Sequence, residues 1–217
     1  MTRFLPVVLL LVCSGPMAAR AHEPALAQFG ALDDSHAGWR PITTKDGITI
    51  ERRAVPGSSF FEHRAAIELP LAPEVVAEDV WRALRGADMA NLKKRQILQE
   101  GPSELLLYDQ LRTPVVSDRD YVIRVQRLGD PTRRRTEFRC TSVEGAGPPA
   151  APGHVRIAMI RAGWLVEPGP SGGTRLTYFA YAEPGGLITA FIARGAQADR
   201  ALADIEHMSQ RLRRLMH

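Results

Sequence analysis

The chain has 217 residues, and its 28 Lys and Arg side chains outnumber its 24 Asp and Glu side chains by four. Apart from two short arginine runs this excess is spread out, which excludes the large clustered positive charge that a nucleic-acid-binding surface requires. Hydrophobic residues make up 45% of the sequence, and the length suffices for one domain with a sizeable apolar core.

The first 21 residues predict a secretory signal peptide. Arg3 supplies the positive start, and residues 4–12 form an apolar run that is too short to span a bilayer. Residues 19–21 read Ala-Arg-Ala, a small-x-small cleavage site before His22. We therefore expect an exported protein, periplasmic or secreted; an uncleaved N-terminal anchor is the alternative. The mature chain would keep one cysteine, Cys140, so no intrachain disulfide is expected.

The rest of the sequence predicts one sheet with two helical interruptions. Residues 22–38 are expected to form a short helix and a linker. Alternating apolar and polar residues, bounded by Gly and Pro turns, predict strands at 39–45, 48–55, 60–69, 96–100, 104–111, 119–127, 134–143, 154–166 and 175–182. Pro73 opens a helix that ends at Gly86, and a second short helix is expected over 87–93. This order predicts an α+β fold.

A long amphipathic helix is predicted at the C-terminal end, after the Glu-Pro-Gly-Gly sequence of residues 183–186. Its apolar residues recur at spacings of three and four: Ile188, Phe191, Ile192, Gly195, Ala198, Leu202, Ile205, Leu212 and Leu215. Most of its charged residues, Asp204 among them, are placed on the opposite side. Such a helix is stable when its apolar stripe is buried, here against the sheet. It either plugs a packed core or roofs a cavity, with residues 184–186 as the expected hinge.

Two motifs resemble those of START domains, the steroidogenic-acute-regulatory-related lipid-transfer family. Residues 113–124, Thr-Pro-Val-Val-Ser-Asp-Arg-Asp-Tyr-Val-Ile-Arg, resemble the Pro-x-Val-x-x-Arg-Asp-Tyr strand of that family. Residues 174–178, with the Glu-Pro-Gly-Gly sequence and the long helix, are similar to its last strand and gripping helix. Trp39 and the Lys-Asp-Gly-Ile sequence of residues 45–48 are similar to its opening hairpin.

The resemblance implies a helix-grip fold for residues 39–217: a curved antiparallel sheet of about nine strands around the C-terminal helix, with two short central helices. It implies a tunnel for one lipid or sterol-like ligand, transient contact with a membrane surface and a monomeric carrier. From the residues we expect no enzymatic activity, cofactor, metal or nucleic-acid partner. The residues expected to line the ligand site are Phe61, His63, Ala65, Tyr108, Arg119, Tyr121, Ile123, Met159, Tyr178, Ile188, Phe191 and Ile192.

Several of these residues have a structural alternative. Arg119 shares a strand face with apolar residues, so it either contacts a ligand headgroup or forms an ion pair with Glu100, Glu104 or Asp109. His63 is either a core histidine or a hydrogen-bonding partner of the ligand. The three tyrosines suit a lipid tunnel and a packed core equally.

The sequence departs from the family where several animal members place an arginine, six residues after the arginine of Arg-Asp-Tyr. Val125 stands there, and Arg124 turns to the opposite strand face, which predicts a more apolar wall. Two other functions stay open: a cyclase or aromatase of the same superfamily, and a lipid sensor or adaptor that transfers nothing. Against catalysis, Ser171 lacks nucleophile-elbow spacing, and the histidines lack metal-ligand spacing.

Overall fold

The computed structural model describes residues 38–87, 89, 91–113, 117–157, 159–183, 185 and 190–216. Within helix α3 the side chains of residues 190–197 are not described. The expected signal peptide and N-terminal helix lie outside the described residues. All structural statements below concern the compact unit Asp34–His217.

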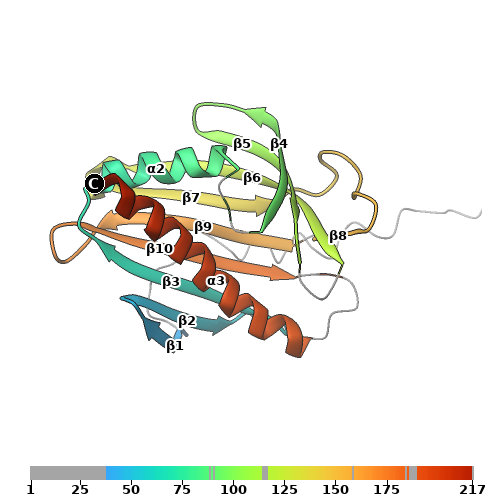
Figure 1. The fold of residues 1–217 in the computed structure, drawn as a ribbon, viewed down its shortest axis with the longest axis horizontal. Helices are drawn as coiled ribbons and strands as arrows, with labels where there is room; N and C mark the ends of the chain where they lie inside the picture. Colours follow the sequence, from blue (N-terminus) through green and yellow to red (C-terminus); the bar gives the residue numbers. More distant parts are fainter. Residues whose placement is uncertain are drawn as a thin grey trace, which may run out of the picture. The chain divides into compact units, whose positions relative to one another are not determined.

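One large sheet dominates this unit (Figure 1). Its strands are β1 (Arg40–Lys45), β2 (Ile48–Ala54), β3 (Phe61–Leu69), β4 (Leu92–Glu100), β5 (Glu104–Leu111), β6 (Asp118–Asp130), β7 (Arg135–Ser142), β8 (His154–Arg156), β9 (Met159–Pro168) and β10 (Thr174–Glu183). Nine of them follow the order β1-β2-β3-β10-β9-β7-β6-β5-β4 with antiparallel pairing. The remaining strand, β8, pairs in parallel with β6.

Two helices, α2 (Pro73–Arg85) and α3 (Ala190–Arg213), cover one face of this sheet (Figure 1). The longer helix, α3, contacts β2, β3 and β10, whereas α2 contacts β7, β9 and β10. Short 3-10 helices, Pro131–Arg133 and Arg214–Met216, follow β6 and α3. We call the covered face the inner face. In the described part of the chain no helix is long and apolar enough to cross a membrane.

Helix α2 follows the sequence pattern closely. Pro73 occupies its first turn, where a missing N–H costs nothing, and the amide of Gly86 closes its last turn on the carbonyl of Arg82. Val76 and Val80 are fully buried, and Trp81 stacks on Phe138 of β7 with ring centroids 6.0 Å apart. This contact between the helix and the sheet ties α2 to the inner face.

The predicted second central helix is wrong where it can be checked. Ala87 and Met89 lie in bends, Asn91 lies in a turn, and β4 begins at Leu92. Asn91 has a φ of 64°, a left-handed conformation that an asparagine adopts more readily than most residues. A single residue of this kind ends a helical path, so the chain enters the strand directly.

The predicted strand over 154–166 is broken into β8 and β9. Ile157 and Ile160 both belong to the apolar core, although a spacing of three residues places side chains on opposite faces of one continuous strand. The break lets both reach the core. It also lets β8 turn onto β6, where the Ile157 amide donates to the Asp120 carbonyl.

The apolar stripe of α3 differs in part from the predicted one. Ile205 and Leu212 are fully buried as expected, but Leu215 lies beyond the helix and is 47% exposed. Ala201 and Met208 also belong to the core, although neither was in the predicted stripe. The C-terminal half of α3 is therefore packed into the core. Of the expected hinge, Gly185 alone is described, and its φ is 66°.

An ion pair fixes the C-terminal end of α3 to α2. Arg211 donates from Nε and Nη2 to the two oxygens of Asp79, at 2.7 and 3.0 Å, and Arg82 adds a bond of 2.9 Å. The Asp79 side chain is 2% exposed, so its charge depends on these partners.

Arg211→Ala is expected to lower the free energy of unfolding by about 2 kcal/mol, because it leaves Asp79 buried with one partner. Chemical denaturation measures the change. Arg213→Ala, in the same last turn but exposed, is the matched control and should change stability by less than about 0.5 kcal/mol. Equal effects of the two substitutions would contradict this role.

Candidate functional site

The strand register brings seven of the predicted ligand-site residues to the inner face. Residues paired across antiparallel strands point to the same side, so the register assigns faces directly. Ala65 pairs with Tyr178, and His63 pairs with Ala180. On β6 Tyr121 and Ile123 belong to the apolar core. By alternation along β3 and β6, the inner face carries Phe61, His63, Ala65, Arg119, Tyr121, Ile123 and Tyr178.

Two predicted residues lie on the other face and are corrected. Tyr108 alternates with the core residue Leu107, and its hydroxyl donates to Asp120 Oδ2 at 2.9 Å. Met159 alternates with the core residue Ile160 and pairs with Glu183. Both Tyr108 and Met159 are buried, so hydrophobicity alone could not assign the face. We remove both from the candidate site.

The side chains of the last three predicted residues are not among those that the structure describes. Ile188 lies outside the described residues, and Phe191 and Ile192 lie in α3 where side chains are not described. Their assignment to the ligand site stays a prediction.

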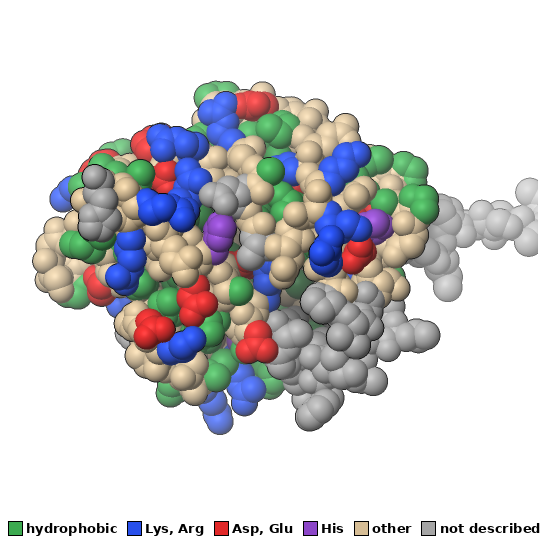
Figure 2. Space-filling view, viewed as in Figure 1, with side chains coloured by type: hydrophobic (Ala, Val, Ile, Leu, Met, Phe, Trp, Pro, Cys, Tyr) green, Lys and Arg blue, Asp and Glu red, His purple; other side chains and the backbone are tan. Residues whose placement is uncertain are grey.

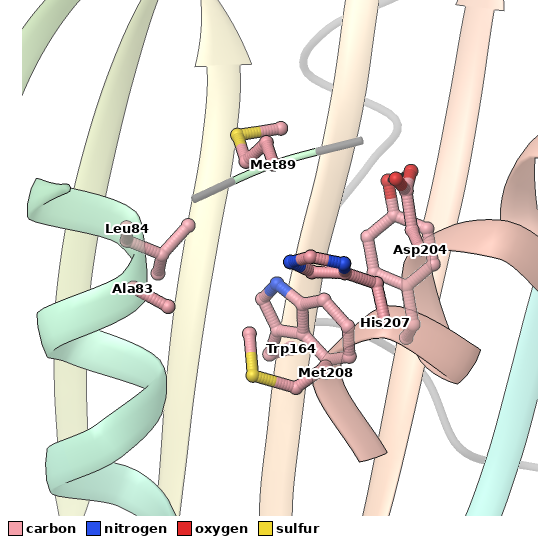
Figure 3. Close-up of a pocket in the computed structure, with 8 residues that line it drawn as sticks. Ala83, Leu84, Met89, Trp164, Asp204, His207 and Met208 are labelled. Atoms are coloured by element: carbon pink, nitrogen blue, oxygen red, sulfur yellow. Dashed lines mark hydrogen bonds between the residues drawn. The ribbon is translucent and has the colours of Figure 1, made fainter. Parts of the chain in front are cut away.

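A pocket opens on the inner face between α2 and α3 (Figure 3). Its cavity volume is about 40 Å³, and it is lined by Ala83, Leu84, Met89, Trp164, Tyr178, Asp204, His207 and Met208. Tyr178 is the predicted site residue in this lining. Trp164, a core residue, packs against Tyr178 with ring centroids 4.5 Å apart. A cavity of this size admits the end of a ligand, so a lipid-sized body requires further space.

The polar side of the pocket is built around Asp204. Its Oδ2 accepts from the Tyr178 hydroxyl at 3.1 Å and from Arg200 Nε at 2.9 Å. Asp204 is 8% exposed, and this burial raises the pKa of its carboxyl, while Arg200 and Tyr178 oppose the rise. Burial also raises the pKa of Tyr178 well above its ordinary value. The sequence-based assignment of Asp204 to the outer side of α3 is wrong.

A buried arginine that sequence reasoning missed holds one wall of the pocket. Arg95 of β4 binds both oxygens of Asp109, at 2.8 and 2.6 Å, and their side chains are 4% and 0% exposed. Its Nη1 donates to the carbonyls of Leu84 and Gly86, and Nη2 contacts Met89 Sδ at 2.8 Å. Arg95 thus satisfies carbonyls at the end of α2 and positions Leu84 and Met89 beside the cavity.

The alternative in which Arg119 forms a structural ion pair is not supported. Of its expected partners, Asp109 binds Arg95, Glu100 binds Arg85 and Glu104 binds Arg124. Arg119 itself donates to the Ser117 carbonyl. It is 4% exposed, and its Nε finds no hydrogen-bond partner among the described residues. Contact with a ligand headgroup stays a prediction.

The apolar wall expected at Val125 is present. Val125 is fully buried in the core, and Arg124 lies on the other face, 3.3 Å from Glu104. Cys140, paired with Val125, is buried, and burial raises the pKa of its thiol to about 12. Among the described residues no group of three or more His, Cys, Asp or Glu could hold a metal ion.

Basic side chains gather on the surface over α2 and the C-terminal end of α3 (Figure 2). On α2 the Arg82 side chain is 66% exposed, and Arg213 and Arg214 at the C-terminal end of α3 are exposed. Exposed apolar residues also occur on these elements: Val75 on α2, and Leu215 and Met216 after α3. This surface combines positive charge with apolar side chains.

Comparisons with known proteins agree with this architecture, although no family model matches the chain. An uncharacterised Pseudomonas aeruginosa protein is 26% identical over 183 residues, which cover 82% of this chain and 89% of that protein. Rho GTPase-activating protein 7 of Rattus norvegicus is 29% identical over 159 residues, or 71% of this chain and 14% of that much longer protein.

Solved structures give the fold. A STAR-related lipid transfer protein from Xanthomonas axonopodis is 26% identical with a TM-score of 0.72, covering 81% of this chain and 99% of that one. Human StAR-related lipid transfer protein 5 is 18% identical with a TM-score of 0.70, covering 85% and 90%. The Zhui aromatase/cyclase from Streptomyces sp. R1128 shares the fold more distantly, at 16% identity and a TM-score of 0.50 over 72% and 95%. The resemblance to START domains is thus confirmed for the fold, which is the helix-grip fold of these lipid transfer structures.

Proposed function

We propose that the chain binds one hydrophobic ligand, a lipid or sterol-like molecule, beneath α3 and transfers it. The observation that carries this proposal is the pocket under α3 in a START fold, with apolar walls formed by α2 and β9. The Xanthomonas and human structures are lipid transfer proteins, which supports the same ligand class here. Burial of apolar surface drives such binding, at about 0.8 kcal/mol per CH₂ group.

The ligand body would extend from the pocket along the inner face toward the N-terminal half of α3. Phe61, Ala65 and Ile123 lie on that face, and the described C-terminal half of α3 is already packed into the core. Arg211 and Asp79 hold this packed half in place. We therefore place the bulk of the ligand beyond it, with Arg119 and His63 as polar groups on the same face.

We propose a carrier and not an enzyme. Within the pocket lining the ionisable groups are Tyr178, Asp204 and His207. Asp204 accepts hydrogen bonds from Arg200 and Tyr178, and burial raises the pKa of the Tyr178 hydroxyl, so both side chains already bond to protein groups. The likeness to the aromatase/cyclase extends to the fold alone and does not favour catalysis.

The exposed arginines with Val75, Leu215 and Met216 support transient docking on an anionic membrane surface during transfer.

The first 21 residues support export to the periplasm or beyond. The intact mass of protein purified from its own cells should therefore lack residues 1–21; a full-length mass would argue against cleavage there.

A ring added inside the pocket tests the binding site. Ala83→Phe should lower the affinity for a pyrene-labelled fatty acid or a fluorescent sterol at least about tenfold, because the phenyl group occupies the cavity. Val75→Phe adds the same ring at an exposed position of α2 and should leave the affinity unchanged. Fluorescence titration measures both. Unaltered binding by a folded Ala83→Phe protein would place the ligand elsewhere.

A further inference from the structure

The carboxylate of Asp204 keeps one oxygen available on the pocket side. Both hydrogen bonds that it accepts from described residues, from the Tyr178 hydroxyl and from Arg200 Nε, end on Oδ2. Oδ1 accepts none from the described residues and is not among the fully buried polar atoms that lack a partner, and Asp204 lines the pocket. Figure 3 shows Asp204 and His207 at one side of the cavity and Leu84 and Met89 at the other. The pocket thus offers a fixed hydrogen-bond acceptor.

The other walls exclude a ligand that is polar throughout. Of the other lining residues His207 is polar, whereas Trp164, Met208, Ala83, Leu84 and Met89 are mainly apolar and form the rest of the cavity wall. These side chains offer almost no hydrogen-bond partners, so a polar group placed against them would lose its hydration without replacement. A group that reaches Asp204 Oδ1 must therefore be a small polar end on an apolar body.

The charge around Asp204 decides which polar end fits. Arg200 lies 2.9 Å from the carboxylate and offsets its negative charge, and His207 acts in the same direction, so a cationic group gains little net attraction. An anionic headgroup would bring a second negative charge against a carboxylate whose pKa burial already raises. A neutral hydrogen-bond donor meets neither penalty. A hydroxyl group is the smallest neutral donor found on lipids and sterols.

We propose that this pocket binds the hydroxyl end of an otherwise apolar ligand, with the hydroxyl donating a hydrogen bond to Asp204 Oδ1. The proposal rests on the proposed function, since it takes an apolar ligand beneath α3 as given, and it narrows that ligand to an alcohol. Tyr178 and Arg200 are positioning residues, because they hold the carboxylate through Oδ2 and leave Oδ1 for the ligand.

Three matched probes test the proposal: a pyrene-labelled long-chain alcohol, its methyl ether and the corresponding carboxylic acid. The wild-type protein should bind the alcohol about tenfold or more tightly than the ether, because the ether cannot donate, and should bind the acid no better than the ether. Asp204→Ala should bind the alcohol and the ether with about equal affinity. Asp199→Asn, an exposed change on the same helix, should retain the full preference.

The outcomes distinguish failure of the Asp204 assignment from failure of the proposed lipid-binding function. Equal binding of alcohol and ether by the wild type, or an undiminished preference in Asp204→Ala, would overturn the assignment of Asp204 and leave the lipid-binding function standing. Binding of none of the three probes by the wild type would overturn both. If Asp204→Ala shows no cooperative thermal transition, the same criterion applies to Asp204→Asn, which keeps the side-chain shape but weakens the acceptor.

Discussion

Replacing Arg95 by alanine is expected to lower the free energy of unfolding by about 3–5 kcal/mol. The substitution leaves the fully buried Asp109 carboxylate without its partner and removes the donor that satisfies the Leu84 and Gly86 carbonyls. An uncompensated buried charge is among the most destabilising single changes, because its lost hydration is not replaced. Urea denaturation at neutral pH measures the loss.

Two further variants make this result specific. Arg124→Ala breaks an exposed pair with Glu104 on the same sheet and should cost less than about 0.5 kcal/mol. Arg95→Met combined with Asp109→Leu removes both charges and should recover part of the loss seen for Arg95→Ala. A cost below about 1 kcal/mol for Arg95→Ala would show that water reaches this pair and that it is not a buried support of the pocket wall.

His63 is expected to make the protein unstable in mild acid. Its side chain is 1% exposed, and burial, aided by the nearby Arg52 charge, lowers its pKa from 6.5 to about 4. The unfolded chain therefore binds a proton at a higher pH than the folded chain does. Stability should be full above pH 6.5, fall as the pH drops toward 4 and level off below that, with a total loss of about 3 kcal/mol.

Denaturation curves of His63→Gln measured between pH 4 and 8 test this assignment. Glutamine has no charge to acquire, so the variant should lose most of the stability change between pH 6.5 and 4 that the wild type shows. His154→Gln, on the short strand β8, is the control and should show the same stability change between pH 6.5 and 4 as the wild type. The same pH dependence in His63→Gln and in the wild type would assign the acid sensitivity to other groups.

Much of the fold follows from local patterns in the sequence. The strands β3 and β5 and the helix α2 lie where alternation and the Pro73–Gly86 boundaries place them. Their periods are regular and their turns carry Gly or Pro, so local preference and tertiary packing agree. The break at Ile157 lies in a predicted strand, 154–166, whose apolar residues fall on both faces in the sequence.

The candidate site was harder to predict because it depends on register and on long-range partners. Tyr108 and Met159 are both buried. Only the pairing of β5 with β4 and of β9 with β10 reveals that they lie on the other face. Asp204 is a charged residue among other charged residues of α3, and Tyr178 and Arg200 make its burial tolerable. In the sequence nothing distinguishes Arg95 from the surface arginines. Its burial becomes evident only in the fold, where Asp109 and the end of α2 lie beside it.

The proposed function requires that a single apolar ligand occupies the interior beneath α3. Native mass spectrometry of the protein purified from its own envelope, in wild-type and Ala83→Phe forms, tests it most directly. The wild type should show the added mass of one lipid-sized ligand, and solvent extraction should recover that ligand. Ala83→Phe should be detected mainly without it. Identical ligand-free masses for both proteins, even after incubation with the extracted envelope lipids, would contradict the claim.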